Sequence, residues 1–342
     1  MSTPSDAQEK GQMFIPARAK TVVMGRQGYL SVVLRLIGVE LYKLQRRTLS
    51  RVLIAVSMLA VLLVFTVIGI SAEQVRSAPL SQFTSQSTRT TNGTVSLAQA
   101  SAIKQQTLSS VSAPLRFPAS LVMTSQVIET GGLVLIIILA GTIVGGEYSV
   151  GTVRLMLTRG PTRTQFLLAK VGALAICVFA GTLGLILFGG IIGAIFNALV
   201  GGGYSGYAAV VGLLPHAILY MLAGMLQLFM YAVLATCLSI VGRATVAGVA
   251  GTLIWWVIEN LLGDLLRLIG AANQGFLGDF ARALPDYFIS NNVSALLDHQ
   301  RQYLLNGTPT GISDLHALLV LACYVIVLLG LAWWVNMQRD IA

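Results

Sequence analysis

Polar residues inside strongly apolar stretches are the first side chains of this sequence that could do chemistry. Glu129, Gln227 and the neighbouring pair Glu259 and Asn260 all lie in or near stretches apolar enough to cross a membrane. Ionisable side chains are costly in lipid, so such positions indicate a transport pathway, a gate or an ion relay. The same residues also fit simpler roles, at the ends of membrane spans or in hydrogen bonds between helices. The sequence leaves both interpretations open.

Motifs for catalysis are missing from the sequence. It contains no phosphate-binding P-loop, no His-Glu-x-x-His, no nucleophile elbow and no dinucleotide fingerprint. The three cysteines and three histidines are scattered, without the spacing of metal ligands or a disulfide framework. The sequence therefore predicts no enzyme activity, no catalytic residue, no metal site and no cofactor bound by this chain. The net charge of +9 comes without a compact basic module, so no nucleic-acid partner is predicted.

Lipid rather than water is expected to face most of the surface. Of the 342 residues, 55% are hydrophobic and only 10% are charged, and the mean hydropathy is +0.79. Soluble domains average about 25% charged residues. Runs of about 20 apolar residues are long enough to cross a bilayer as helices. We therefore predict an all-α, polytopic membrane protein with six transmembrane helices, over about Val52–Ile70, Ser120–Val144, Val171–Leu199, Val210–Val241, Val246–Leu262 and Leu315–Val335.

The distribution of basic residues predicts the orientation. Fifteen of the 22 Lys and Arg residues lie near the two termini or in the connections after the second and fourth spans. The positive-inside rule then places both termini in the cytoplasm, in a multi-pass protein of the cell (inner or plasma) membrane. We therefore expect residues 1–28 to form a cytoplasmic tail, and 71–119 and 270–314 to form extracytoplasmic loops. We expect a short helix near 96–109 and, around Pro285, two short interfacial or re-entrant helices before the last span.

An amphipathic helix is predicted over 29–50, ahead of the first span. At 100° per residue one face carries six apolar side chains: Leu30, Val33, Leu34, Ile37, Leu41 and Leu44. The opposite face carries Arg35, Glu40, Lys43, Arg46 and Arg47. This pattern is typical of a helix that lies in the membrane interface, and it also fits a helix packed on another subunit.

The connection over 146–170, between the second and third predicted spans, is a polar interruption in an apolar chain. It reads GGEYSVGTVRLMLTRGPTRTQFLLAK from Gly145. Tyr148–Leu157 is expected to form a short helix across the membrane plane, and Gly160 with Pro161 to end it. Thr162 is placed to cap the next helix. A partner that holds such a short helix would move both adjoining spans.

This segment resembles the membrane subunits of ABC-2 type transporters. The pattern is carried by Glu147, Gly151, Thr152, Leu157, Thr158, Pro161, Arg163 and Lys170. The text ALPDYFISNNVSALL before the last span is similar to the family's element between spans five and six. The resemblance covers 29–342 and implies an ABC-2 type transmembrane domain.

What the resemblance implies is a permease, an exporter by family habit, with an amphipathic or hydrophobic substrate. A separate ABC ATPase subunit would bind ATP and Mg, and a second copy or a paralogous permease would complete the pathway. The helix 148–160 would couple to the ATPase through Glu147, Tyr148, Gly151, Thr152, Arg154, Leu157, Thr158 and Arg159. One alternative is a stand-alone, ion-coupled secondary transporter that uses intramembrane carboxylates. Another is a membrane-embedded scaffold or enzyme.

Overall fold

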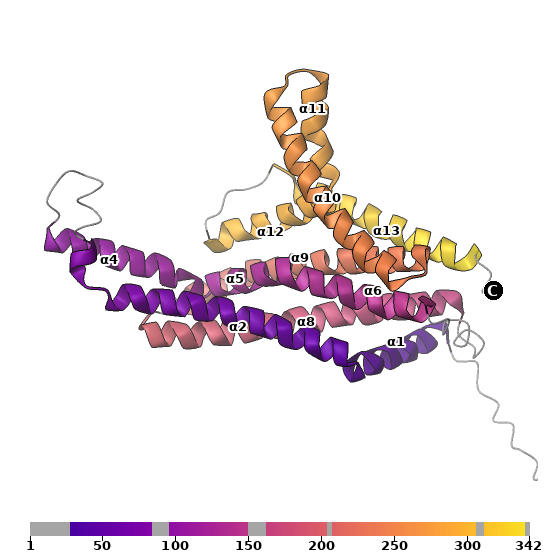
Figure 1. The fold of residues 1–342 in the computed structure, drawn as a ribbon, viewed down its shortest axis with the longest axis horizontal. Coiled ribbons are helices and arrows are strands. Elements are labelled where there is room, and N and C mark those ends of the chain that lie inside the picture. Colours follow the sequence, from indigo (N-terminus) through magenta and orange to yellow (C-terminus); the bar gives the residue numbers. More distant parts are fainter. Residues whose placement is uncertain (1–27, 84–95, 150–161, 204–206, 306–310, 339–342) are drawn as a thin grey trace, which may run out of the picture.

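The computed structural model describes residues 28–83, 96–149, 162–203, 207–305 and 311–338, and within these ranges every regular element is a helix (Figure 1). The longer helices are α1 (Tyr29–Arg46), α2 (Thr48–Ser77), α4 (Leu97–Ser112), α5 (Ala119–Val127), α6 (Leu133–Ser149), α8 (Arg163–Val200), α9 (Tyr207–Gly242), α10 (Thr245–Ala272), α11 (Phe276–Ala283), α12 (Ile289–Leu305) and α13 (Asp314–Gln338). Three short elements join them: the 3-10 helices η1 (Ala113–Leu115) and η3 (Leu284–Tyr287) and the π-helix η2 (Ile128–Gly132).

Within the part of the chain that the structure describes, six helical stretches are long and apolar enough to cross a membrane, in agreement with the predicted number of spans. They are α2, the continuous run of α5, η2 and α6, then α8, α9, α10 and α13. Several of them extend beyond the apolar runs. Residues 71–77, expected in a loop, continue α2, where Arg76 pairs with Glu73 one turn earlier. The protein is thus a helical membrane protein with six candidate spans.

Helix α9 forms the centre of the bundle. In its most apolar window 61% of the residues are buried, against 17% in α2 and in α13. It packs against α6, α8, α10, α12 and α13. Close contact between α6 and α10 depends on glycine: a Cβ on Gly145 would lie 2.6 Å from the Thr245 Cα. The glycine spacing on α6 therefore serves packing within one chain.

Figure 1 shows α2, α5, α6, α8 and α9 side by side along the long axis, with α10 leaving the bundle and projecting from it together with α11. We name the end where α6 ends, α8 begins and α13 ends the proximal end. The opposite end, where α4 lies, is the distal end. The predicted helix near 96–109 is present as α4, and the two helices expected around Pro285 are present as α11 and α12.

The first two helices meet at an elbow. The predicted N-terminal helix is present as α1, but it ends at Arg46, and residues 48–50 belong to α2. The backbone of Arg47 is extended there, with φ −72° and ψ 128°. Helix α1 packs on α8 at the proximal end. A Cβ on Gly172 of α8 would lie 2.7 Å from the Ile37 side chain, so this glycine permits the close approach of α1.

Candidate functional site

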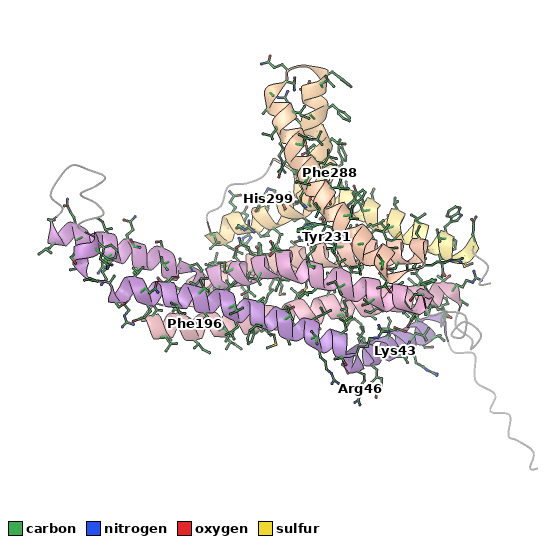
Figure 2. The ribbon with its side chains drawn as sticks, in the orientation of Figure 1. Lys43, Arg46, Phe196, Tyr231, Phe288 and His299 are labelled. Atoms are coloured by element: carbon green, nitrogen blue, oxygen red, sulfur yellow. The ribbon has the colours of Figure 1, made fainter. Side chains whose placement is uncertain are left out.

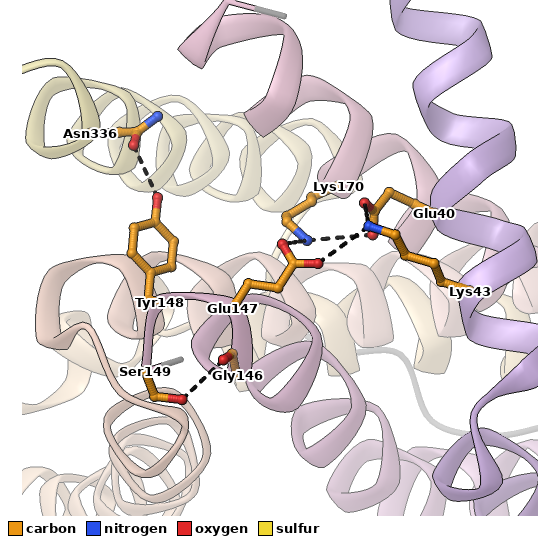
Figure 3. Close-up of polar contacts among 8 residues, drawn as sticks. All are labelled: Glu40, Lys43, Gly146, Glu147, Tyr148, Ser149, Lys170 and Asn336. Carbon is orange, nitrogen blue, oxygen red and sulfur yellow. Dashed lines mark hydrogen bonds and ion pairs between the residues drawn. The ribbon is translucent and has the colours of Figure 1, made fainter. Parts of the chain in front are cut away.

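Four charged side chains from three helices meet at the proximal end and form what we name the charge cluster: Glu40, Lys43, Glu147 and Lys170 (Figure 3). Lys170 Nζ lies 2.7 Å from Glu147 Oε2 and 3.4 Å from Glu40 Oε2. Lys43 Nζ lies 2.8 Å from Glu40 Oε1 and 3.5 Å from Glu147 Oε1. Each ammonium group therefore contacts both carboxylates, and the four charges sum to zero.

The charge cluster is buried around Lys170. The Lys170 side chain is 1% exposed, Glu147 7% and Glu40 9%, whereas Lys43 at the rim is 32% exposed. Lys170 Nζ also lies 4.9 Å from the centre of the Phe166 ring. A buried charge costs several kcal/mol unless it is paired, and removing one partner leaves the other uncompensated. Moving α1, α6 or α8 alone would separate these charges, so the cluster couples the positions of the three helices.

The predicted location of Glu40 is wrong. The helical pattern placed it on the polar face of the N-terminal helix, but it is buried against the bundle. Burial acts to raise the pKa of the Glu40 carboxyl. Attraction to Lys170 and the hydrogen bond from Lys43 outweigh burial, and the net effect is a lowered pKa. Glu40 therefore remains charged, held by one cation of its own helix and one of α8.

The last span is joined to both sides of the segment 150–161. On one side, the Tyr148 hydroxyl donates a hydrogen bond to Asn336 Oδ1 at 3.0 Å. On the other, Arg163 Nη1 donates to the backbone carbonyls of Asn336 at 2.8 Å and Met337 at 3.1 Å. The end of α6 and the start of α8 thus both contact the end of α13. They also contact each other through the charge cluster.

Helix α8 begins with the predicted cap at Thr162. The Thr162 hydroxyl accepts a hydrogen bond from the Gln165 backbone N–H at 3.3 Å, and the Gln165 side chain accepts one from the Thr162 N–H at 3.0 Å. This reciprocal arrangement is a capping box, which satisfies two otherwise unpaired donors of the first helical turn. Pro161 precedes it, so the helix start is fixed by local sequence.

The other residues predicted for ATPase coupling lie outside the described residues: Gly151, Thr152, Arg154, Leu157, Thr158 and Arg159. Of the predicted interfacial residues, Arg35 is exposed, and the Arg46 guanidinium lies 5.4 Å from the centre of the Tyr42 ring. Lys43, by contrast, points into the charge cluster. The periodicity of the N-terminal helix did not predict that its charged side chains contact α6 and α8.

Glu129 belongs to a second, separate polar network nearer the distal end. It lies in η2, and π-helical turns of this kind are frequent at functional sites. The Tyr220 hydroxyl donates to Glu129 Oε1 at 3.1 Å and accepts a hydrogen bond from Arg301 Nη2 at 3.1 Å. Arg301 also forms ion pairs with Asp298 at 2.8 Å and with Glu129 at 3.9 Å. Burial acts to lower the pKa of Arg301, but Tyr220 and the two carboxylates outweigh it and raise that pKa.

Glu259 is buried and contacts neutral donors. Its carboxylate accepts a hydrogen bond from the Tyr231 hydroxyl at 3.2 Å and another from the Ser290 backbone N–H at 3.2 Å. Ser290 lies in the first turn of α12, where unpaired N–H groups and the helix dipole favour a negative charge. Glu259 therefore joins α9, α10 and the start of α12.

The two remaining polar residues proposed for a pathway do not join these networks. Asn260 is exposed, and its amide donates to the Trp256 backbone carbonyl at 2.7 Å. The Gln227 amide oxygen is buried in α9 without a hydrogen-bond partner in the part of the chain that the structure describes. The four polar positions are thus distributed over at least three places rather than gathered at one.

Sequence reasoning did not identify Tyr220, Arg301 or Asn336. Tyr220 and Asn336 lie in apolar spans, where an isolated tyrosine or asparagine is a weak signal. Arg301 lies in a predicted outer helix, 172 positions from Glu129 in the chain. A buried carboxylate requires a partner, but its identity depends on which helices become neighbours.

The fold and these contacts define a helical membrane protein with six candidate spans and a buried charge cluster at one end. The chain belongs to the family described as Protein of unknown function (DUF2705), whose family model matches residues 122–342. The match includes Glu147 and Lys170, while Glu40 and Lys43 precede it. No curated protein matches the chain.

Proposed function

We propose that this chain is the permease subunit of an ATP-driven ABC-2 type transporter, an exporter of an amphipathic or hydrophobic substrate. In this proposal it lies in the cell (inner or plasma) membrane with both termini in the cytoplasm. It pairs with a second copy or a paralogous permease, and a separate ABC ATPase subunit binds ATP and Mg. The segment 148–160 contacts that ATPase.

The observation that carries the proposal is the anchoring of both sides of this segment. Glu147 pairs with Lys170 across it, so the end of α6 and the start of α8 are joined by a buried ion pair. Tyr148 and Arg163 both contact the end of α13 at Asn336. A displacement of the segment would therefore act on α1, α6, α8 and α13 together, which is the requirement for a coupling element.

The ion-coupled alternative draws on Glu129 and Glu259. Both carboxylates accept hydrogen bonds from tyrosine hydroxyls, and they belong to different networks. A relay needs groups that exchange protons with one another. The separation of the two networks supports the ATP-driven proposal over this alternative.

The test is purification of the tagged chain in mild detergent from its native host, with identification of any co-purifying ATPase. ATP hydrolysis by the complex is then measured in liposomes. Glu147 is a poor target because it holds the charge cluster. We therefore choose Arg154→Glu, Gly151→Leu and a scrambled 150–160 segment, which leaves Tyr148 and its contact with Asn336 in place. We expect each to weaken ATPase retention while the thermal midpoint stays near that of the unaltered chain.

Arg35→Glu provides the matched control, because it makes the same charge change at an exposed position on the same predicted side. It should leave ATPase retention unchanged. The proposal fails if no ATPase accompanies the chain under several gentle conditions, or if the scrambled segment retains it as well as the unaltered one. Uptake or efflux driven by an ion gradient without ATP would instead favour the secondary transporter.

A further inference from the structure

An apolar groove of about 540 Å³ begins at the elbow between α1 and α2. Ligand sites typically measure about 300–1,000 Å³. One face of α2 forms the first wall, the η2–α6 run the second and α8 the third, with Leu44 and Gln45 of α1 at the elbow. The α2 wall consists of Ser50, Leu53, Ile54, Ser57 and Met58.

The length of the groove corresponds to one leaflet of a bilayer. From Ser50 to Met58 the α2 wall rises about 12 Å, at about 1.5 Å per residue. The hydrocarbon core of a bilayer is about 30 Å thick, so one leaflet contributes about 15 Å. An apolar groove of this length, starting where the first span starts, matches an acyl chain of the leaflet at the elbow.

The elbow end of the groove is strongly basic. Arg46, Arg47 and Arg51 lie within six residues, and none forms an ion pair among the residues that the structure describes. Figure 2 shows Arg46 at the elbow, directed away from the bundle. Arg51 Nε donates to the backbone carbonyl of Gln45 at 3.2 Å, which places this guanidinium beside a residue that lines the groove.

A buried hydroxyl at the elbow lacks a partner. Serine and threonine in helices usually donate to the carbonyl four residues earlier, as Ser57 does to Leu53 at 2.9 Å. The residue four before Ser50 is Arg46, on the far side of the break at Arg47. Ser50 Oγ is buried with no hydrogen-bond partner in the described ranges, and Ser50 lines the groove.

We propose that this groove binds one anionic phospholipid. An acyl chain fills the groove, the phosphate lies against Arg46, Arg47 and Arg51, and the Ser50 hydroxyl donates to an ester or phosphate oxygen. Each basic residue near a membrane surface favours anionic lipid about fivefold. The segment 1–27 carries four basic and two acidic residues, so its charge argues against its occupying a basic site. The proposal is independent of the ATP-driven function.

The test uses the full chain in lipid nanodiscs made from phosphatidylcholine and phosphatidylglycerol in a 4:1 ratio. After transfer to detergent, native mass spectrometry counts the lipids that each protomer retains. We expect one retained phosphatidylglycerol. The triple variant Arg46→Gln, Arg47→Gln and Arg51→Gln should reduce the preference for phosphatidylglycerol more than tenfold. A matched control, Arg35→Gln with Arg76→Gln and Arg267→Gln, removes three exposed charges elsewhere and should keep the preference.

A second pair of variants tests the apolar part of the site. Gly181 and Gly184 of α8 line the groove, and a Cβ built on either meets nothing within 4 Å, so Gly181→Leu with Gly184→Leu should fold and fill it. We expect loss of the retained lipid. Gly190→Leu, on the same helix and also in open space, lies outside the groove and should retain it.

Three results would overturn the proposal. The first is equal retention of lipid in the groove-filled variant and in Gly190→Leu. The second is thermal stabilisation by inorganic phosphate equal to that by phosphatidylglycerol, which would mean that the acyl chain contributes nothing. The third is a second protomer in place of the lipid in the mass spectrum, which would make this face an interface between copies of the chain.

Discussion

The charge cluster and the two carboxylate networks solve the same physical problem in different ways. Each keeps a carboxylate inside an apolar helical bundle. In the charge cluster, two carboxylates are balanced by two ammonium groups, one of which is 1% exposed. Glu259, in contrast, is held by a hydroxyl and a backbone N–H. Glu129 is intermediate, because it accepts a hydrogen bond from a neutral tyrosine hydroxyl and its Oε2 also lies 3.9 Å from Arg301 Nη2.

This difference predicts that the charge cluster and the Glu259 network respond to different substitutions. Ion pairing depends on charge, so a neutral substitution in the cluster leaves a buried charge uncompensated. A carboxylate held by neutral donors depends instead on having an acceptor oxygen, which an amide also provides. The proximal end is therefore expected to be sensitive to loss of charge, and the Glu259 network to loss of an acceptor.

The largest effect is expected from Lys170→Met. It removes the cation between Glu40 and Glu147 and should lower the free energy of unfolding by about 3–5 kcal/mol. Thermal denaturation in detergent measures this as a lower midpoint. Lys43→Met is the control, because its side chain is 32% exposed and its loss should cost less.

A double-mutant cycle tests whether the cost belongs to the pair. Combining Lys170→Met with Glu147→Gln should recover part of the loss, with a coupling free energy of about 1 kcal/mol or more. Equal losses for Lys170→Met and Lys43→Met, or additive effects in the cycle, would contradict the view that burial of Lys170 makes the cluster dependent on charge.

The next largest effect is expected at Glu259. Glu259→Leu removes the acceptor of Tyr231 and Ser290 and should cost about 2 kcal/mol, since each buried, unpaired donor costs about 1–3 kcal/mol. Glu259→Gln keeps one acceptor oxygen and should cost clearly less. Hydrogen exchange at the Ser290 amide gives a local measurement, with faster exchange expected in Glu259→Leu. If Gln is as damaging as Leu, the charge itself stabilises the start of α12.

The sequence predicts the parts of this fold that are governed by local patterns. Six apolar runs predict the six spans, and Thr162 predicts the cap at the start of α8, because helix capping involves only neighbouring residues. Contacts between distant residues are different in kind. Periodicity assigned Glu40 to a polar face, and Lys170, 130 positions later, determines its burial. No pattern within residues 29–50 contains that information.

The same limit applies to the candidate sites. The segment around Glu147 and Lys170 is recognisable by its polar residues, but nothing local indicates that these two side chains meet. Glu129 and Glu259 look alike in sequence, each a single carboxylate beside apolar residues. Their different partners, a tyrosine linked to Arg301 and the first turn of α12, come from the packing of α12 on α9 and beside α10.

A smaller effect is expected from pH at the charge cluster. The pKa of Glu40 is lowered from its ordinary value of 4.5, so near and below that pH the unfolded chain binds more protons than the folded one. The stability that Glu40 contributes is present above pH 4.5 and is lost as the pH falls through its folded pKa. The difference in thermal midpoint between the unaltered chain and Glu40→Gln should therefore shrink on acidification from pH 6 to pH 4. A constant difference would show that Glu40 acts by shape alone.

The smallest measurable effect is expected from Tyr220→Phe. Tyr220 is fully buried, and the change removes one donor to Glu129 and one acceptor from Arg301 while leaving both charges in place. Such a hydrogen bond contributes about 1 kcal/mol. Asp264→Asn serves as the reference, because its pair with Arg267 is exposed and should contribute close to nothing. A loss for Tyr220→Phe as large as that for Lys170→Met would mean that the hydroxyl, rather than the pairing with Arg301, holds the Glu129 side chain in place. The contrast between the charge cluster and the Glu129 network would then be one of degree.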